Sequence, residues 1–293
     1  MIDVIIPTYN RVLSLEKVID SYMTQSELGL LVIVDDWSTD DTKEWTERLS
    51  GKYPGKVLYV KPDEKKTMPE LRNIGVSKCV HDYIFMGEDD VLLPKDHLKI
   101  LLEKMVEYHA DVIAGRRLDL HAGETLEQAM ERSDKDRHPM FVRVPFEAYF
   151  DRYVDHAQEV PHLHSNALMR RKIFEQVQYD PQFGSNGFVF REETDFFMRV
   201  KAAGFSVWMI PDTVSYHLKK MLANKTGGSR KPRIIFEYLV WRNTWRFFLK
   251  NRAIFKKDFG VKNIYWFALC SLLARYPYAL RRRKRAKQYQ SHV

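Results

Sequence analysis

The chain has 293 residues, of which 45% are hydrophobic, enough for the core of one large domain or of a domain with an appendage. Its two cysteines, Cys79 and Cys270, lie far apart and form no metal or redox motif, so we expect free thiols in a reducing compartment. The net charge of +8 is uneven, because residues 230–293 carry +15 and residues 1–229 therefore carry −7. The two parts face different partners.

Strands and helices alternate along residues 1–220. Continuous apolar runs predict strands over residues 4–6, 30–34, 57–60, 83–86, 112–114, 165–169 and 206–210. Helical spacing of apolar residues or capping residues predicts helices over residues 15–22, 42–49, 71–77, 98–109 and 192–203. Residues 115–165 lose periodicity and read as a long insertion on the acceptor side. The pattern predicts an α/β fold with a mostly parallel sheet flanked by helices.

Acidic residues follow several of the predicted strands directly. Asp35 and Asp36 follow the second strand, and Glu88, Asp89 and Asp90 follow the run 83–86. The carboxyl ends of parallel strands border the crevice where open sheets bind ligands. Crowded carboxylates repel one another there, and a hard divalent cation shared with a phosphate would neutralise them. The alternative is an acidic turn whose carboxylates are merely solvated.

Residues from 234 onward form a basic, aromatic extension. Ile234, Tyr238, Trp241, Trp245 and Phe248 recur at helical spacing beside a row of basic side chains, which predicts an amphipathic helix. A second apolar stretch, residues 264–273, is shorter than the ~20 residues that span a bilayer, and a polybasic run fills residues 281–287. This composition suits an anionic membrane surface. Packing on the catalytic domain and a solvated tail are the alternatives, and no nucleic-acid motif is present.

Five motifs in order resemble the family-2 glycosyltransferases with the GT-A fold, and the resemblance covers about residues 1–220. They are Val4-Ile5-Ile6-Pro7-Thr8-Tyr9-Asn10-Arg11, Val34-Asp35-Asp36-Trp37-Ser38-Thr39-Asp40, Leu71-Arg72-Asn73-Ile74-Gly75, Glu88-Asp89-Asp90 and Arg191-Glu192-Glu193-Thr194-Asp195, and His217 follows them. No GxGxxG motif follows the first strand and no GxxxxGK motif occurs, so a dinucleotide-dependent dehydrogenase or a P-loop enzyme is excluded.

The resemblance implies a metal-dependent, inverting transfer of a sugar from a nucleoside-diphosphate sugar to an acceptor hydroxyl. Glu88, Asp90 and His217 would hold Mn²⁺ or Mg²⁺, and Glu193 would be the catalytic base, with Asp195 as a competing candidate. Contacts to the nucleotide sugar are implied for Pro7, Thr8, Tyr9, Asn10, Arg11, Asp35, Asp36, Arg72, Asn73, Glu88 and Asp89.

The chain departs from the family pattern at three positions. Glu88 stands where the first Asp of the metal motif is usual, and Glu193 stands where the base is usually Asp. Trp37 replaces a frequent Gly, and its bulky side chain is expected to disfavour a left-handed turn. His162 and His164 are two residues apart, a poor zinc spacing on a helix, and are expected near the acceptor pocket or in ordinary packing.

We therefore expect a catalytic domain over residues 1–228 and a membrane-attaching extension over 229–293. The run Ile2 to Pro7 is too short for a secretory signal and contains Asp3, so we expect a cytosolic enzyme on the inner face of the membrane. Its acceptor would be a glycan or a polyprenyl-linked sugar, in the synthesis of a surface polysaccharide or a lipid-linked glycan. A catalytically silent sugar-nucleotide or glycan binding module and a polybasic membrane scaffold are the alternative functions.

Overall fold

The structure is a computed structural model that describes residues 1–218 and 232–276, apart from the side chains of residues 185–187. The predicted polybasic run 281–287 and the predicted domain boundary at residue 228 lie outside the described residues.

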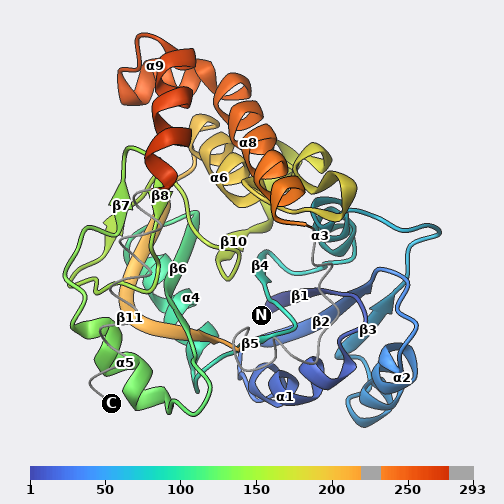
Figure 1. The fold of residues 1–293 in the computed structure, drawn as a ribbon. Coiled ribbons are helices and arrows are strands. Elements are labelled where there is room, and N and C mark those ends of the chain that lie inside the picture. Colours follow the sequence, from blue (N-terminus) through green and yellow to red (C-terminus); the bar gives the residue numbers. More distant parts are fainter. Residues whose placement is uncertain (219–231, 277–293) are drawn as a thin grey trace.

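A nine-stranded sheet forms the centre of the described molecule, in the order β3-β2-β1-β4-β10-β6-β11-β5 with β9 beside β11 (Figure 1). The strands are β1 (Ile2–Thr8), β2 (Leu28–Asp35), β3 (Val57–Val60), β4 (Tyr83–Met86), β5 (Val91–Leu92), β6 (Val112–Asp119), β9 (Gln158–Glu159), β10 (Leu168–Arg170) and β11 (Val207–His217). The neighbours β3, β2, β1 and β4 run parallel, as do β6 and β11, whereas β10 lies antiparallel between β4 and β6. A small hairpin, β7 (Phe141–Val142) and β8 (Glu147–Ala148), stands apart.

Helices cover both faces of this sheet. The described helices include α1 (Val12–Met23), α2 (Thr42–Lys52), α3 (Met68–Ser77), α4 (His97–Glu107), α5 (Leu126–Asp134), α6 (Glu192–Ala202), α8 (Arg233–Lys250) and α9 (Arg252–Phe259), with 3₁₀ turns at η1 (Arg171–Glu175) and η2 (Pro181–Gly187). One core joins the sheet to α1, α2 and α4, and a second core on the other face joins it to α3, η1 and α6. Burial on both faces explains why the strands read as continuous apolar runs.

The chain turns sharply into the acidic loop directly after β4. The Gly87 N–H donates to the Ile5 carbonyl at 2.8 Å, which extends the pairing of β1 and β4 by one residue. A Cβ at this position would lie 2.9 Å from the Ile6 side chain and 3.3 Å from the Ile5 carbonyl oxygen. Only glycine fits this close approach, so Gly87 brings the acidic loop against the end of β1.

The segment predicted as an unpatterned insertion contains regular structure. Strand β6 continues to Asp119, five residues beyond the predicted end, and α5 follows it. Helix α5 begins with a capping box in which the side chains of Thr125 and Gln128 bond reciprocally to backbone N–H groups. The Thr125–Gln128 capping box was therefore a local signal for α5 that the sequence analysis missed.

The helices after residue 232 pack on the preceding part of the chain and on each other. Figure 1 places α8 next to α6, and the buried side chains of α8 include Leu239, Val240 and Phe247. Phe247 belongs to an aromatic cluster with Phe146, which follows the cis-proline turn at the β7–β8 hairpin, and Phe255 of α9. Residues 264–276 form a further helix.

The opposite face of α8 is exposed and aromatic. Tyr238 is 64% exposed and Ile234 is 85% exposed, and a surface groove is lined by Tyr238, Trp241, Arg242, Trp245 and Arg246. The helix therefore has two apolar faces, one buried against the protein and one exposed. In the part of the chain that the structure describes, no helix is long and apolar enough to cross a membrane.

Candidate active site

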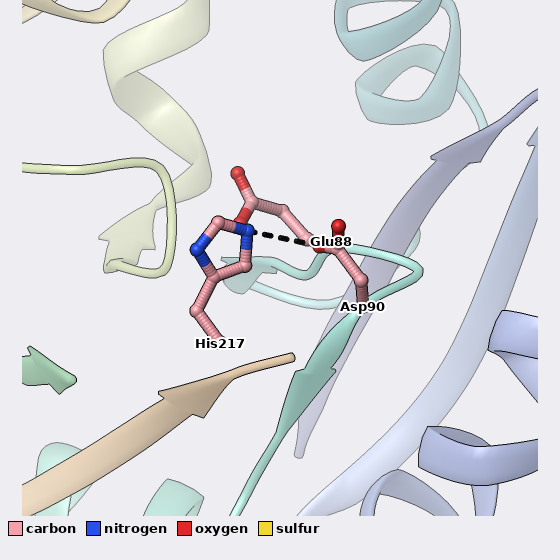
Figure 2. Close-up of side chains that lie close together, drawn as sticks. All are labelled: Glu88, Asp90 and His217. Atoms are coloured by element: carbon pink, nitrogen blue, oxygen red, sulfur yellow. Dashed lines mark ion pairs between the residues drawn. The ribbon is translucent and has the colours of Figure 1, made fainter. Parts of the chain in front are cut away.

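Three side chains from distant parts of the sequence form one cluster of possible metal ligands. Glu88 and Asp90 lie in the loop after β4, and His217 is the last residue of β11 (Figure 2). One ligand atom from each lies within 4.8 Å of the others, and His217 Nε2 is 3.3 Å from an Asp90 carboxylate oxygen. Strand β5 pairs with the end of β11, with Val91 opposite His217, and this pairing brings them together. The set fits Mn²⁺ or Mg²⁺, which prefer oxygen ligands.

Arg11 and Thr8 hold the remaining oxygens of the acidic loop. The Arg11 guanidinium donates to Asp90 at 2.8 Å and to Asp89 at 3.2 Å, and the Thr8 hydroxyl donates to Asp89 at 2.9 Å. Asp89 and Asp90 therefore face the carboxyl end of β1, the edge at which the sequence predicted them. Asp89 itself is held by Thr8 and Arg11 and is not among the clustered ligands.

Arg72 joins the cluster of possible metal ligands to the first turn of α6. Its guanidinium lies 3.0 Å from Glu193, 3.6 Å from Glu192 and 4.0 Å from Glu88, and the side chain is 5% exposed. Helix α3 holds Arg72 in place through the capping box of Thr67 and Glu70 at its start. The predicted base and the predicted metal ligands thus lie on either side of one buried cation.

Arg117 and Ser165 complete the surroundings of Glu88, and the sequence analysis identified neither of them. Arg117 approaches one Glu88 carboxylate oxygen at 3.4 Å, and the Ser165 hydroxyl donates to the other. Burial alone would raise the pKa of Glu88, but the charges of Arg117 and His217 hold that pKa below its usual value. Glu88 is therefore ionised at neutral pH.

Carboxyl groups outnumber arginine side chains in the site. Burial raises the pKa of Asp89 to about 7, against the opposing charge of Arg11. Burial, together with the charge of Glu193, likewise raises the pKa of Glu192 to about 7. Asp90 is buried too, but its bond to His217 and the charge of that residue lower its pKa to about 2. The excess of carboxylates over arginines is the electrostatic condition in which a divalent cation binds well.

Asp119 orients His217 from behind. His217 Nδ1 lies 3.0 Å from an Asp119 carboxylate oxygen, and the two residues are directly opposite each other in the β6–β11 pairing. Burial lowers the pKa of His217, but its bonds to Asp119 and Asp90 outweigh burial and raise it to about 9. The sequence analysis missed Asp119 because its role arises only from the register of two strands.

The predicted nucleotide residues line the ends of β1 and β2. Asp35 is buried and accepts bonds from Ser38 and from the Tyr59 hydroxyl, so its carboxylate shapes the loop after β2. Asp36 accepts a bond from the Lys66 backbone at 2.8 Å. Burial raises the pKa of Asp36.

The loop after β1 is tied to the loop after β2. Asn10 accepts a bond from the Thr39 N–H at 2.6 Å, and its own N–H donates to Ser38. Tyr9 is 39% exposed and lies under the Lys65 ammonium at 4.6 Å. Pro7 is opposite Val34 in the β1–β2 pairing. Pro7, Thr8, Tyr9, Asn10, Arg11, Asp35 and Asp36 are therefore grouped at one end of the sheet.

The expectation that Trp37 avoids a left-handed conformation is wrong. Its φ is 62°, in the left-handed region. The indole Nε1 donates to the Pro62 carbonyl at 2.9 Å, and the Lys61 ammonium lies 4.4 Å from the ring centre. These contacts offset a backbone conformation that costs a non-glycine residue about 1–2 kcal/mol.

Asn73 and Asp195 face away from the carboxylate cluster. The Asn73 side chain exchanges two hydrogen bonds with the Tyr179 backbone. Asp195 is fully buried and accepts bonds from Arg199, Lys250 and Asn251. Of the two predicted candidates for the base, only Glu193 has its carboxylate beside the metal cluster.

The two histidines at 162 and 164 are buried. His162 packs among Phe141, Phe146 and Phe150, and His164 Nε2 lies 2.9 Å from the Gly115 carbonyl. These contacts are ordinary packing, one of the two expectations that the sequence left open for these histidines.

Comparison with known proteins identifies the family of this chain. A sequence model described as "Glycosyl transferase family 2" matches residues 3–178. The chain belongs to glycosyl transferase family 2. This confirms the resemblance seen in the five sequence motifs. The match spans β1 to η1 and includes Glu88 and Asp90 but not Glu193 or His217.

Curated relatives within family 2 share a moderate part of the sequence. Glycosyltransferase GlyA of Streptococcus pneumoniae is 25% identical over 259 residues, which are 83% of this chain and 32% of that protein. The Campylobacter jejuni GalNAc(5)-diNAcBac-PP-undecaprenol beta-1,3-glucosyltransferase is 32% identical over 145 residues, 46% of each chain. The chain thus spans about a third and about half of the length of these two relatives.

Solved structures confirm the GT-A fold of this family-2 chain. Staphylococcus aureus TarS, residues 1–349, in complex with UDP-GlcNAc has a TM-score of 0.59 and 17% identity, covering 85% of this chain and 65% of that one. GalNAc-T7 with UDP, GalNAc and Mn²⁺ has a TM-score of 0.62 and 13% identity, covering 91% and 55%. The mostly parallel sheet with flanking helices is the fold that the sequence predicted.

Proposed function

We propose that this family-2 chain is a metal-dependent, inverting glycosyltransferase that moves a sugar from a nucleoside-diphosphate sugar to an acceptor hydroxyl. The observation that carries the proposal is the position of Glu193 beside the cluster of Glu88, Asp90 and His217, with Arg72 between them. A base next to a site for a diphosphate-bound cation suits direct displacement at an anomeric carbon, because one activates the attacking hydroxyl and the other would stabilise the leaving diphosphate.

The donor would lie across the ends of β1 and β2. Thr8, Tyr9 and Asp36 would hold the base and the ribose, and Arg11 and Arg72 would face the diphosphate with their positive charge. TarS was solved with UDP-GlcNAc and with UDP, and GalNAc-T7 with UDP and Mn²⁺, which supports a nucleoside-diphosphate donor here.

Glu88, Asp90 and His217 would hold Mn²⁺ or Mg²⁺. The cation would act as a Lewis acid and stabilise the leaving diphosphate. Two negative ligands and one imidazole leave coordination positions for phosphate oxygens. Glu193 would take the proton of the acceptor hydroxyl while that oxygen attacks from the face opposite the leaving group. The configuration at the anomeric carbon would invert.

The acceptor would be a glycan or a polyprenyl-linked sugar, in the synthesis of a surface polysaccharide or a lipid-linked glycan. The name of the Campylobacter relative includes a PP-undecaprenol acceptor, which supports this class. The aromatic, basic groove of α8 would rest on the anionic inner face of a membrane, with the enzyme on the cytoplasmic side. Tyr and Trp favour the membrane interface, where an apolar ring and a polar edge are both satisfied.

The test is metal-dependent release of nucleoside diphosphate from a panel of sugar nucleotides, with and without Mn²⁺. We expect one or a few donors to be hydrolysed slowly without acceptor and faster with it. Asp90→Ala removes a cation ligand at a strand end, so we expect it to abolish both metal-dependent donor binding, measured by calorimetry, and transfer. A silent binding module would bind donor and release no diphosphate, and undiminished binding by Asp90→Ala would remove the metal assignment.

A further inference from the structure

The first turn of α6 is held from two sides. Glu193 faces Arg72 and the metal cluster, while Asp195, two residues later, faces the opposite way because successive helical residues are separated by about 100°. The Asp195 carboxylate is fully buried and accepts bonds at 2.8 Å from Arg199 Nε, Lys250 Nζ and Asn251 Nδ2. These three hydrogen bonds tie the first turn of α6 to the residues around it.

Two of these three partners lie at the corner between α8 and α9. Lys250 is the last residue of α8, and Asn251, which is 2% exposed, joins the two helices. The Asn251 amide donates to Asp195 and also to the Phe247 carbonyl, so its orientation is fixed by its own helix. Lys250 additionally pairs with Asp180 at 2.6 Å, in the segment before η2.

Further contacts link α8 to the residues just before Glu193. Asn243, fully buried in α8, donates to the carbonyls of Phe183 and Phe190 at 3.1 Å. Arg191 begins α6 with a φ of 71°, and its guanidinium lies 5.4 Å from the Phe247 ring centre of α8 while donating to the Phe146 carbonyl. A left-handed arginine persists only where its surroundings fix it.

We infer that α8 and α9 form a positioning element for the catalytic base, acting through Lys250, Asn251 and Asp195 on the first turn of α6. The inference rests on the proposed role of Glu193 as base. Lys250 and Asn251 act through Asp195, and none of the three is among the clustered metal ligands. Loosening their contact changes where the Glu193 carboxylate lies and leaves the donor and metal contacts of β1, β2 and the acidic loop in place.

The experiment compares Lys250→Met, Asn251→Ala and the double variant with the wild type in steady-state transfer to a soluble acceptor. We expect kcat to fall at least tenfold in the double variant and by a smaller factor in each single variant. The KM for the donor and the Kd for Mn²⁺, measured by calorimetry, stay within twofold of wild type. Lys250→Arg keeps the charge and the reach, and we expect it to retain most of the wild-type kcat.

Lys201→Met is the matched control, because Lys201 lies at the other end of α6 and pairs with the exposed Glu159 at 2.7 Å. We expect its kcat to equal that of wild type, since exposed ion pairs contribute little. A kcat within twofold of wild type in folded Lys250→Met and Asn251→Ala would overturn the inference. So would an equal rise in donor KM and Mn²⁺ Kd, which would indicate general loosening.

If the double variant fails to fold, Lys250→Met decides alone, because that side chain is partly exposed and its methylene stem is preserved. The outcomes also separate the two proposals. A wild-type protein that hydrolyses no donor contradicts the proposed function, whereas an active wild type with equally active variants contradicts only the role of α8 and α9.

Discussion

Arg72 is the residue on which the two halves of the site depend. It is buried, stacks over Tyr179 at 5.1 Å and contacts Glu88, Glu192 and Glu193. Opposing carboxylates hold the pKa of Arg72 above its ordinary value despite its burial. A permanent cation between a proposed metal ligand and a proposed base keeps two negative groups near each other without a bound ion.

The assignment of the base predicts unequal effects of two neighbouring substitutions. Glu193→Gln keeps the shape of the side chain but cannot accept a proton, so we expect turnover to fall about 10²–10⁴-fold with donor and Mn²⁺ affinity near normal. Asp195→Asn leaves the base intact but weakens three buried bonds, so we expect a smaller loss of turnover and a destabilisation of about 1–3 kcal/mol.

Single-turnover kinetics and urea unfolding of both variants measure these effects. The reverse order, with Asp195→Asn inactive and Glu193→Gln active, would move the base two residues along the helix.

The Asp119–His217 contact predicts an effect on metal affinity. A carboxylate behind a metal-binding histidine fixes its tautomer and ring orientation, and losing such a partner typically weakens metal binding about 10–100-fold. We expect Asp119→Ala to lower Mn²⁺ affinity by that factor in calorimetry. Asp212→Asn, on the same strand but paired with Lys104, is the control and should bind Mn²⁺ like wild type. Equal affinity in Asp119→Ala would show that His217 needs no such support.

At the scale of elements, buried histidines lie where helices and hairpins meet the sheet. His97 begins α4, is 1% exposed and bonds to Thr213 of β11, and burial lowers its pKa to about 3. Burial also lowers the pKa of His162 to about 3, between the β7–β8 hairpin and the sheet. Both are neutral in the folded protein, while the unfolded chain protonates them near pH 6.5.

Each of these histidines makes the unfolded chain bind more protons than the folded one as pH falls below about 6.5. The free energy of unfolding is therefore not lowered by these groups above that pH. Below it, each residue lowers the free energy of unfolding by about 1.4 kcal/mol per pH unit. We expect His97→Gln to reduce the slope of unfolding free energy between pH 6 and 5 by about that amount. Urea titrations at several pH values measure it, with the exposed His156→Gln as a control that keeps the wild-type slope.

The sequence predicted the strands and the order of the site motifs because buried parallel strands are continuous apolar runs with polar residues at their ends. The strand over residues 57–60 and the strand over residues 83–86 agree with β3 and β4 at both ends. Non-local register was out of reach, which is why the partnership of Asp119 with His217 was missed. The side of α6 on which Asp195 lies could have been predicted from helical geometry, because residues two apart point about 200° apart.

At the scale of the whole molecule, α8 presents one face to the protein and another to solvent. The sequence left open whether this helix packs on the protein or contacts a membrane. Its buried face packs on the protein. The exposed face includes Trp245, and Trp266 of the helix at residues 264–276 is 65% exposed. Exposed aromatic residues in such number favour an interfacial partner.

If α8 contacts a membrane, binding to vesicles should have an electrostatic part and an apolar part that can be removed separately. Neutralising the five basic residues 281–285 would remove up to about 5 kcal/mol of attraction, at about 1 kcal/mol each, and this part should be screened by salt. Trp245→Ser with Trp266→Ser should remove a part that salt does not screen. Transfer to a soluble acceptor should survive both changes, because the changed residues are neither proposed site residues nor among the three partners of Asp195.

Co-sedimentation with neutral and anionic vesicles at increasing ionic strength measures the two parts. No preference of the wild type for anionic vesicles, or equal sedimentation of wild type and the charge variant, would leave the basic run as a solvated tail.

The order of the strands also has a consequence for how the protein matures. Strand β5 begins five residues after the end of β4, yet it pairs with the end of β11 rather than with β4. His217 joins Glu88 and Asp90 only after β11, the last described strand along the chain, has docked beside β6 and β5. Pairings between residues so distant in sequence form slowly. The complete set of proposed cation ligands therefore forms only once β11 has paired, so recovery of Mn²⁺ affinity during refolding would report the docking of β11.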